Sequence, residues 1–97
     1  MIFKVVYLPE SKDDIKEARK YLSQFYASTS KKFTALLKKR INNLKSNPFI
    51  CQPYDKRPSY RRLIVNDYLV FYKVDENKKI IQIHRVLHGS CDIGRYI

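Results

Sequence analysis

Length, composition and charge narrow what this chain can be. Its 97 residues are enough for one small domain spanning 1–97, and 44% hydrophobic with 30% charged residues is typical of a globular protein, not a disordered one. No apolar run approaches the ~20 residues of a membrane span, and no signal-peptide pattern opens the chain, so we expect a cytoplasmic protein with no membrane partner. Twenty Lys and Arg against nine Asp and Glu give a formal net charge of +11, which favours a polyanionic partner.

The first half of the chain predicts one strand and two helices. Residues 2–8 are rich in β-branched and aromatic side chains, which is typical of a strand. Ser11 and the acids after it resemble a helix N-terminus, and apolar residues at helical spacing predict a first helix ending near 27–30. A second apolar series over 33–44 predicts another helix, which Pro48 should terminate. Two successive helices with a short polar link form an antiparallel hairpin.

The second half predicts strands. Residues 61–65 and 68–74 alternate like strands around the turn Asn66-Asp67, and 79–87 predicts a third strand of the meander. The order is therefore β-α-α-β-β-β. Because a helical hairpin must bury its apolar stripes, we predict an α+β fold in which the hairpin covers one face of a mainly antiparallel four-stranded sheet. The other face is left for solvent or a ligand.

Basic residues are concentrated on the predicted helices. No Asp or Glu occurs between Glu17 and Asp55. A solvated outer face is one interpretation, and contact with a polyanion is the other, because a surface of one sign repels itself. Together with two basic residues near the end of the chain, the candidate contacts to a target or nucleic acid are Lys31, Lys32, Lys38, Lys39, Arg40, Lys45, Arg85 and Arg95.

The histidines and cysteines do not predict a metal site. His84 and His88 are four residues apart, which on a helix would place both imidazoles on one face. They lie at the end of a predicted strand, where four residues span about 13 Å, too far for one ion. Cys51 and Cys91 have no second cysteine at ligand spacing, so we expect two reduced thiols, no metal and no cofactor.

Strand alternation divides the last strand between two faces. One face carries Ile81, Ile83, Arg85 and Leu87, and the other carries Gln82, His84, Val86 and His88. The more apolar set is expected to meet the helices, with Arg85 either exposed at the edge or paired inside, which would place both histidines on the free face. In the middle strand Tyr68 and Tyr72 share a face, but the pattern leaves open whether that face meets the helices.

If the tyrosines join the histidines, the free face gathers groups that RNA cleavage needs. Arginine stabilises charge on a phosphate, histidine transfers protons near neutral pH, and tyrosine stacks on bases. The candidate catalytic residues are Arg61 or Arg62 for phosphate charge and His88 for proton transfer, with His84, Tyr68 and Tyr72 as supports. The competing interpretation is structural, with histidines that end a strand and tyrosines that complete an apolar sheet.

Several segments together resemble the RelE/ParE superfamily of toxins. They are the first strand, the helix DIKEARKYL of 14–22, the helix end at 44–48, the hairpin RRLIVNDYLVFYKV of 61–74 and the ending RVLHGSCDI of 85–93. The resemblance covers nearly the whole chain and lies in the order and spacing of these segments. Members are the toxins of bacterial type II toxin-antitoxin pairs, so the resemblance implies the β-α-α-β-β-β fold, a growth-arresting toxin and an antitoxin partner.

Two mechanisms occur within this superfamily. RelE-like members cut mRNA on the ribosome without a metal ion, and ParE-like members block DNA gyrase. The long helical hairpin and the ending at 86–89 followed by Asp92 look more like ParE, which implies a gyrase inhibitor. Two residues depart from the family patterns. Leu69 stands where the ribonuclease branch commonly has arginine, and Cys91 stands where ParE-like endings usually have arginine.

The charge of the chain indicates what kind of antitoxin it binds. A basic toxin suits an acidic, partly disordered segment that orders on binding, and we expect this segment across the helical hairpin and part of the sheet. If gyrase is the target, the basic helices and the ending from Arg85 to Ile97 are contact surfaces. If the translating ribosome with its mRNA is the target, the catalytic candidates act on RNA. A non-toxic nucleic-acid-binding module is the third alternative.

Overall fold

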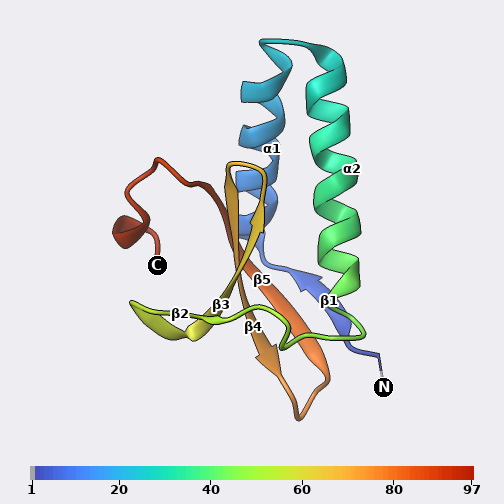
Figure 1. Ribbon diagram of the computed structural model, residues 1–97, viewed down its shortest axis with the longest axis vertical. Coiled ribbons are helices and arrows are strands. Elements are labelled where there is room, and N and C mark those ends of the chain that lie inside the picture. Colours follow the sequence, from blue (N-terminus) through green and yellow to red (C-terminus); the bar gives the residue numbers. More distant parts are fainter. Residues whose placement is uncertain (1) are drawn as a thin grey trace.

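The computed structural model describes residues 2–97 and confirms an α+β fold, in which one short strand is added to the predicted order of elements (Figure 1). The elements in chain order are β1 (Lys4–Tyr7), α1 (Pro9–Ser23), α2 (Ala27–Asn43), β2 (Pro53–Tyr54), β3 (Arg57–Val65), β4 (Tyr68–Asp75), β5 (Ile80–His88) and a short 3-10 helix, η1 (Ile93–Arg95). Figure 1 shows α1 and α2 side by side, with the tip of their hairpin extending beyond the strands.

The sheet is mixed and has five strands instead of the predicted four. Its spatial order is β1-β5-β4-β3-β2, with β1 parallel to β5 and the other neighbours antiparallel. The additional strand, β2, contributes only Pro53 and Tyr54 at one edge. Two residues carry no alternation pattern and proline cannot donate to a ladder, so sequence periodicity gave no sign of this strand.

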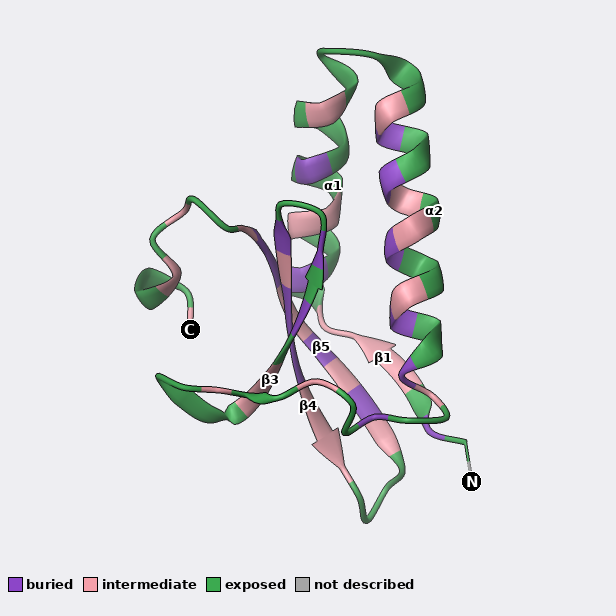
Figure 2. Ribbon diagram, viewed as in Figure 1, coloured by how far each residue is buried: buried purple, intermediate pink, exposed green. Residues whose placement is uncertain are grey.

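The core lies between the helical hairpin and one face of the sheet (Figure 2). Burying one large apolar side chain contributes about 1.5–3 kcal/mol, so the buried row Phe33, Leu37 and Ile41 fixes α2 on the strands. The strand residues of this core are Leu63, Val65, Tyr68, Val70, Tyr72, Ile81, Ile83 and Val86.

The helix boundaries differ from the prediction at the start and end of α1. The helix begins at Pro9, because a proline at the first helical position lacks an N–H that would have no partner there. Ser11 is consequently inside the helix, where its buried hydroxyl donates to the Leu8 carbonyl at 2.7 Å. The helix ends at Ser23, earlier than predicted, and extended backbone at Tyr26 precedes α2. Within residues 2–97, no helix is both long and apolar enough to cross a membrane.

A β-bulge at His84 reverses the alternation of β5. Phe71 of β4 is opposite Arg85, whereas the next residue, Tyr72, is opposite Ile83, so His84 is the extra residue. Beyond the bulge Val86 turns to the helices and is 2% exposed. The prediction that Leu87 meets the helices and that both histidines lie on the opposite face is therefore wrong, because a period of two cannot foresee an inserted residue.

The sheet face opposite the helices is called the free face below. Strand pairing and the bulge assign to it Tyr60, Arg62, Ile64, Leu69, Phe71, Lys73, Gln82, His84, Arg85 and Leu87. Part of this face is covered by other segments of the chain, since Phe71 is fully buried and its ring meets that of Tyr54 in β2.

Candidate functional site

Both candidate tyrosines point into the core. Tyr72 is fully buried, and its hydroxyl donates to the Pro48 carbonyl at 2.9 Å. Tyr68 is 7% exposed, and its ring lies 4.8 Å from that of Phe33 in α2. Burial raises the pKa of both phenols, which keeps them neutral. The sequence left open which sheet face carries Tyr68 and Tyr72, and the structure places both on the face that meets the helices. There the rings stabilise the fold and are not available to stack on a base.

The two histidines lie on opposite faces of the sheet. His88 is on the helix side, where its Nδ1 accepts from the Ser90 N–H at 3.1 Å and its ring meets the Tyr68 ring edge-on at 5.1 Å. His84 is on the free face, and its Nε2 is buried without a hydrogen-bond partner. Burial, assisted by the charge of Lys73, lowers the pKa of His84, so its ring is neutral at neutral pH. The two imidazoles cannot act on one substrate together.

The two candidate arginines are also separated by the sheet. Arg61 faces the helix side, donates to the Cys51 carbonyl at 2.5 Å and lies 4.8 Å above the ring of Phe49. Arg62 is exposed on the free face, 5.8 Å above the ring of Tyr54. Of the six catalytic candidates, only Arg62 and His84 share the free face. In the part of the chain that the structure describes, no three His, Cys, Asp or Glu side chains gather as metal ligands.

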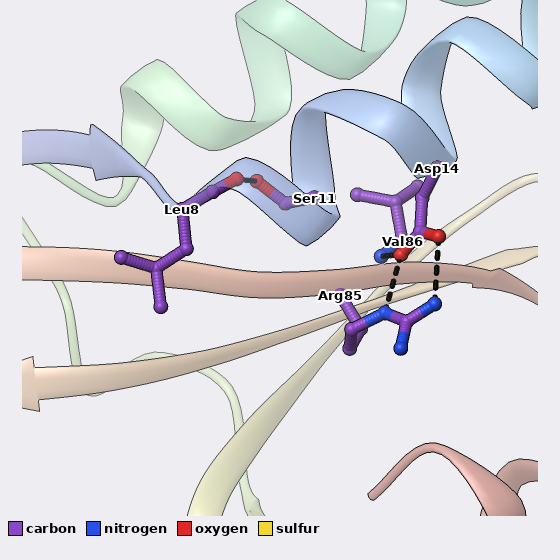
Figure 3. A network of polar contacts seen from close by, with 5 residues as sticks. All are labelled: Leu8, Ser11, Asp14, Arg85 and Val86. Carbon is purple, nitrogen blue, oxygen red and sulfur yellow. Dashed lines mark hydrogen bonds and ion pairs between the residues drawn. The ribbon is translucent and has the colours of Figure 1, made fainter.

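Arg85, a predicted contact residue, is held by the carboxylate of Asp14 (Figure 3). Its Nε and Nη2 donate to Asp14 at 2.7 and 2.8 Å, and the Val86 N–H donates to the same carboxylate at 3.0 Å. This is the one ion pair among residues 2–97, and its side chains are 21% and 12% exposed. The hydrogen bond to Asp14 raises the pKa of Arg85 above its usual value, so the guanidinium stays charged. β1 pairs with β5 only as far as Ile83. Beyond that point the Val86 N–H has no partner on β1, and it donates to Asp14 of α1 instead.

A basic and aromatic cluster that sequence reasoning missed lies on the free face around Tyr60. The Lys73 ammonium is 4.6 Å from the centre of this ring, the Arg57 guanidinium is 5.9 Å away, and the ring of His84 meets it edge-on at 5.1 Å. The strand was predicted to begin at Arg61, so Tyr60 was left out. Extending the alternation of 62 and 64 back by two residues would have found the tyrosine, but not its neighbours on other strands.

The segment after β5 folds back toward this cluster. Arg57 donates to the main-chain oxygen of Ile97 at 2.7 Å, and the Tyr96 ring lies 4.8 Å from the Arg85 guanidinium. Arg95 is exposed within η1. The two residues that hold this segment, Arg57 and Arg85, are both cationic, so the predicted contact surface around Arg85 is shared with residues 96 and 97.

The predicted basic surface is exposed on α2. Lys31, Lys32, Lys38 and Lys39 are exposed, and α2 contains no acidic residue. The remaining two members of the predicted set, Arg40 and Lys45, are partly buried. These four exposed lysines lie together on one helix.

An apolar groove lies beside α2. Its volume is about 410 Å³, and it opens between the hairpin and the β3–β4 turn. Its floor is formed by Leu22, Phe33, Leu36 and Tyr68, and its rim includes Lys32 and Asp67. At the tip of the hairpin three aromatic side chains, Tyr21, Phe25 and Tyr26, are 50–72% exposed. Grooves and exposed apolar groups of this kind mark sites that bind another molecule.

Three solved structures that share this fold are two toxin-antitoxin systems and one free toxin. The chromosomal ParDE system from P. aeruginosa gives a TM-score of 0.76 at 15% identity, covering 90% of this chain and 96% of that one. The RelBE2 toxin-antitoxin complex from Mycobacterium tuberculosis gives 0.67 at 14% identity over 91% and 99% of the chains. A mutant of E. coli toxin RelE in the free state gives 0.63 at 16% identity over 100% of both chains. At these identities the similarity concerns the fold.

Sequence comparison identifies the family. A comparison with curated proteins finds no match. The family model described as the ParE toxin of the type II toxin-antitoxin system parDE matches residues 5–93, from β1 into the segment after β5. The chain therefore belongs to the ParE toxin family of type II toxin-antitoxin systems, as the resemblance of its strand and helix segments predicted.

Proposed function

We propose that this toxin arrests growth by binding and inhibiting DNA gyrase in the cytoplasm, with no bond-breaking chemistry of its own. The observation that carries the proposal is the separation of the catalytic candidates. His84 and His88 lie on opposite faces of the sheet, and the hydroxyl of Tyr72 is committed to the core. General acid-base catalysis requires groups within hydrogen-bond reach of one substrate, and this arrangement does not supply a pair.

The cluster around Tyr60 favours a second candidate, a RelE-like ribosome-dependent endoribonuclease. An aromatic ring flanked by Arg57 and Lys73 suits a base and its phosphate. The ring of His84 lies beside them, and a neutral imidazole is a candidate proton acceptor. Under this alternative the reaction uses the missed cluster, and His88 takes no part.

One experiment separates the two mechanisms. The toxin is induced without an antitoxin, cellular mRNAs are mapped by primer extension soon after growth stops, and the purified toxin is added to a gyrase supercoiling assay. We expect intact messages and inhibited supercoiling. Discrete cuts in messages, lost in a variant with Arg57→Gln and Lys73→Gln but retained with Lys78→Gln in the exposed β4–β5 turn, would establish the ribonuclease and overturn the proposal.

The proposed partner of the free toxin is an acidic, partly disordered antitoxin. Its apolar side chains would occupy the groove over Leu36 and Phe33, and its acids would reach Lys32 on the rim. This matches the predicted position across the hairpin. Leu36→Asp should weaken antitoxin binding by at least tenfold because it places a charge in the apolar floor. Ile64→Asp is the matched control, since Ile64 is exposed on the free face. A complex that leaves the region from Lys31 to Lys45 wholly uncovered would contradict the proposal.

A further inference from the structure

We propose that the outer face of α2 is a binding site for the phosphate backbone of duplex DNA. The choice of DNA rests on the proposed action on gyrase, an enzyme that holds a DNA segment. The chemistry of the site is independent of gyrase, because it follows from the arrangement of four lysines on one helix. These are Lys31, Lys32, Lys38 and Lys39, called the lysine square below.

The lysine square surrounds one small residue. Its members stand four and three positions before Ala35 and three and four positions after it, and Ala35 is exposed. On a helix these spacings put neighbouring Cβ atoms about 5–6 Å apart. The methyl group of Ala35 therefore leaves an open place between four ammonium groups, where an anion can approach all of them.

The protein leaves this charge without compensation. A glutamate at 35 would lie next to all four lysines, and pairs at these spacings stabilise a helix by about 0.2–0.5 kcal/mol each. The sequence places alanine there, and α2 carries no acid at any position. None of the four ammonium groups forms an ion pair with the rest of residues 2–97. Charge that no internal acid neutralises is available to a polyanion.

The composition of the face favours a duplex over other polyanions. Every exposed residue of α2 is Ala, Ser, Lys or Asn, and the exposed side of the helix is directed away from α1 (Figure 2). A protein partner would need aromatic or large apolar anchors, and a single strand would need aromatic rings for stacking. Neither occurs on this face. Lysine, serine and asparagine are the side chains that contact phosphates and sugars of a duplex.

The spacing of the square fits the two strands of a groove. Lys31 and Lys38 are seven residues apart, as are Lys32 and Lys39, which corresponds to about 10.5 Å along the helix axis. The major groove of DNA is about 12 Å wide. With α2 lying across the groove, the first two lysines contact phosphates of one strand and the last two contact those of the other. Such contacts do not depend on base sequence.

The groove for the antitoxin and the lysine square are largely distinct. Leu36 and Phe33 face the sheet side of α2, whereas Lys31, Lys38 and Lys39 do not line the groove. Only Lys32 belongs to both. A toxin can therefore hold its target DNA with a surface that an antitoxin in the groove covers only in part.

The test measures binding of the purified full-length toxin to a short DNA duplex by fluorescence anisotropy, in the absence of gyrase. Four phosphate contacts give a slope of about −3.6 in log affinity against log salt, so affinity should fall roughly a hundredfold between about 50 and 200 mM NaCl. A variant with Lys31→Gln and Lys38→Gln should bind at least tenfold more weakly, with a slope smaller by about 2. Gln removes the charge and has a helix propensity close to that of Lys.

The matched control removes the same charge from the other helix. Lys16→Gln with Lys20→Gln changes two exposed lysines of α1, and we expect DNA affinity within about twofold of the starting protein. Equal weakening by both double variants would show attraction by net charge alone and overturn the site. Loss of antitoxin affinity without loss of DNA affinity would assign the square to the antitoxin and also overturn it. Because gyrase is absent, these outcomes are independent of the supercoiling assay, which tests the proposed function.

Discussion

The two helices of the hairpin have similar lengths but different charge, since α1 is balanced and α2 is strongly basic. In α1 the four acids Glu10, Asp13, Asp14 and Glu17 are balanced by four bases, whereas α2 has five bases and no acid. α1 uses one of its carboxylates to hold the edge of β5, while α2 is held on the sheet by buried apolar side chains. A charge of α1 therefore stabilises the fold directly, whereas the charges of α2 form no internal ion pair and are available to a partner.

The largest expected effect comes from removing the carboxylate that joins α1 to the sheet. Asp14→Ala leaves the partly buried Arg85 guanidinium and the Val86 N–H without their acceptor, so the free energy of unfolding should fall by about 3 kcal/mol. Urea denaturation measures the loss. The control is Asp13→Ala, an exposed acid of the same helix, for which we expect a change within about 0.5 kcal/mol. Equal losses in the two variants would mean that the contact of Asp14 with β5 does not stabilise the fold more than an exposed acid does.

A glutamate placed in the lysine square should stabilise α2 and weaken its binding to DNA. Ala35→Glu can pair with lysines on both sides, which should raise the free energy of unfolding by about 0.5 kcal/mol after the lower helix propensity of Glu is subtracted. The same change should weaken DNA binding more than tenfold, because it places an anion where the phosphate would lie. Thermal melting and anisotropy measure the two effects. Ala35→Gln, of equal length and no charge, is the control. If DNA affinity survives in the Glu variant, the square is not the site.

Salt should have a smaller effect, and it should act on α2 more than on α1. Raising NaCl from about 0.05 to 0.5 M screens repulsion among exposed lysines and should stabilise the protein by a few tenths of a kcal/mol. The pair of Asp14 with Arg85 is short and partly buried, so screening should change it little. Melting temperatures of the starting protein and of Ala35→Glu test this. A gain in the Glu variant as large as in the starting protein would refute the assignment of the repulsion to the square.

The fold was largely predictable because its elements depend on local patterns. The apolar row from Phe33 to Leu44 predicted α2, and the turn at Asn66-Asp67 predicted the hairpin of β3 and β4. The bulge at His84 was not predictable, because the residue types of β5 do not indicate which residue stands outside the strand pairing. It accounts for the wrong assignment of faces in β5, and it removed His88 from the free face.

The candidate site was predictable only where composition alone defines it. The basic surface of α2 was visible as a run without acids, and the structure brings its lysines together. The cluster of Tyr60 with Lys73 depends on the register of two strands. The contact of Asp14 with Arg85 joins residues 71 positions apart, for which no local pattern exists. Such long-range contacts required the structure.

The parallel pairing of β1 with β5 also sets the order in which the toxin can be assembled. Lys4 is opposite Ile80 and Tyr7 is opposite Ile83, so β1 leaves the ribosome well before β5, the strand with which it pairs. Pairing between distant parts of a chain is slow, because the intervening loop must close first. The nascent toxin consequently leaves β1 without its partner while the residues between the two strands are synthesised, and its sheet is completed only when β5 has emerged.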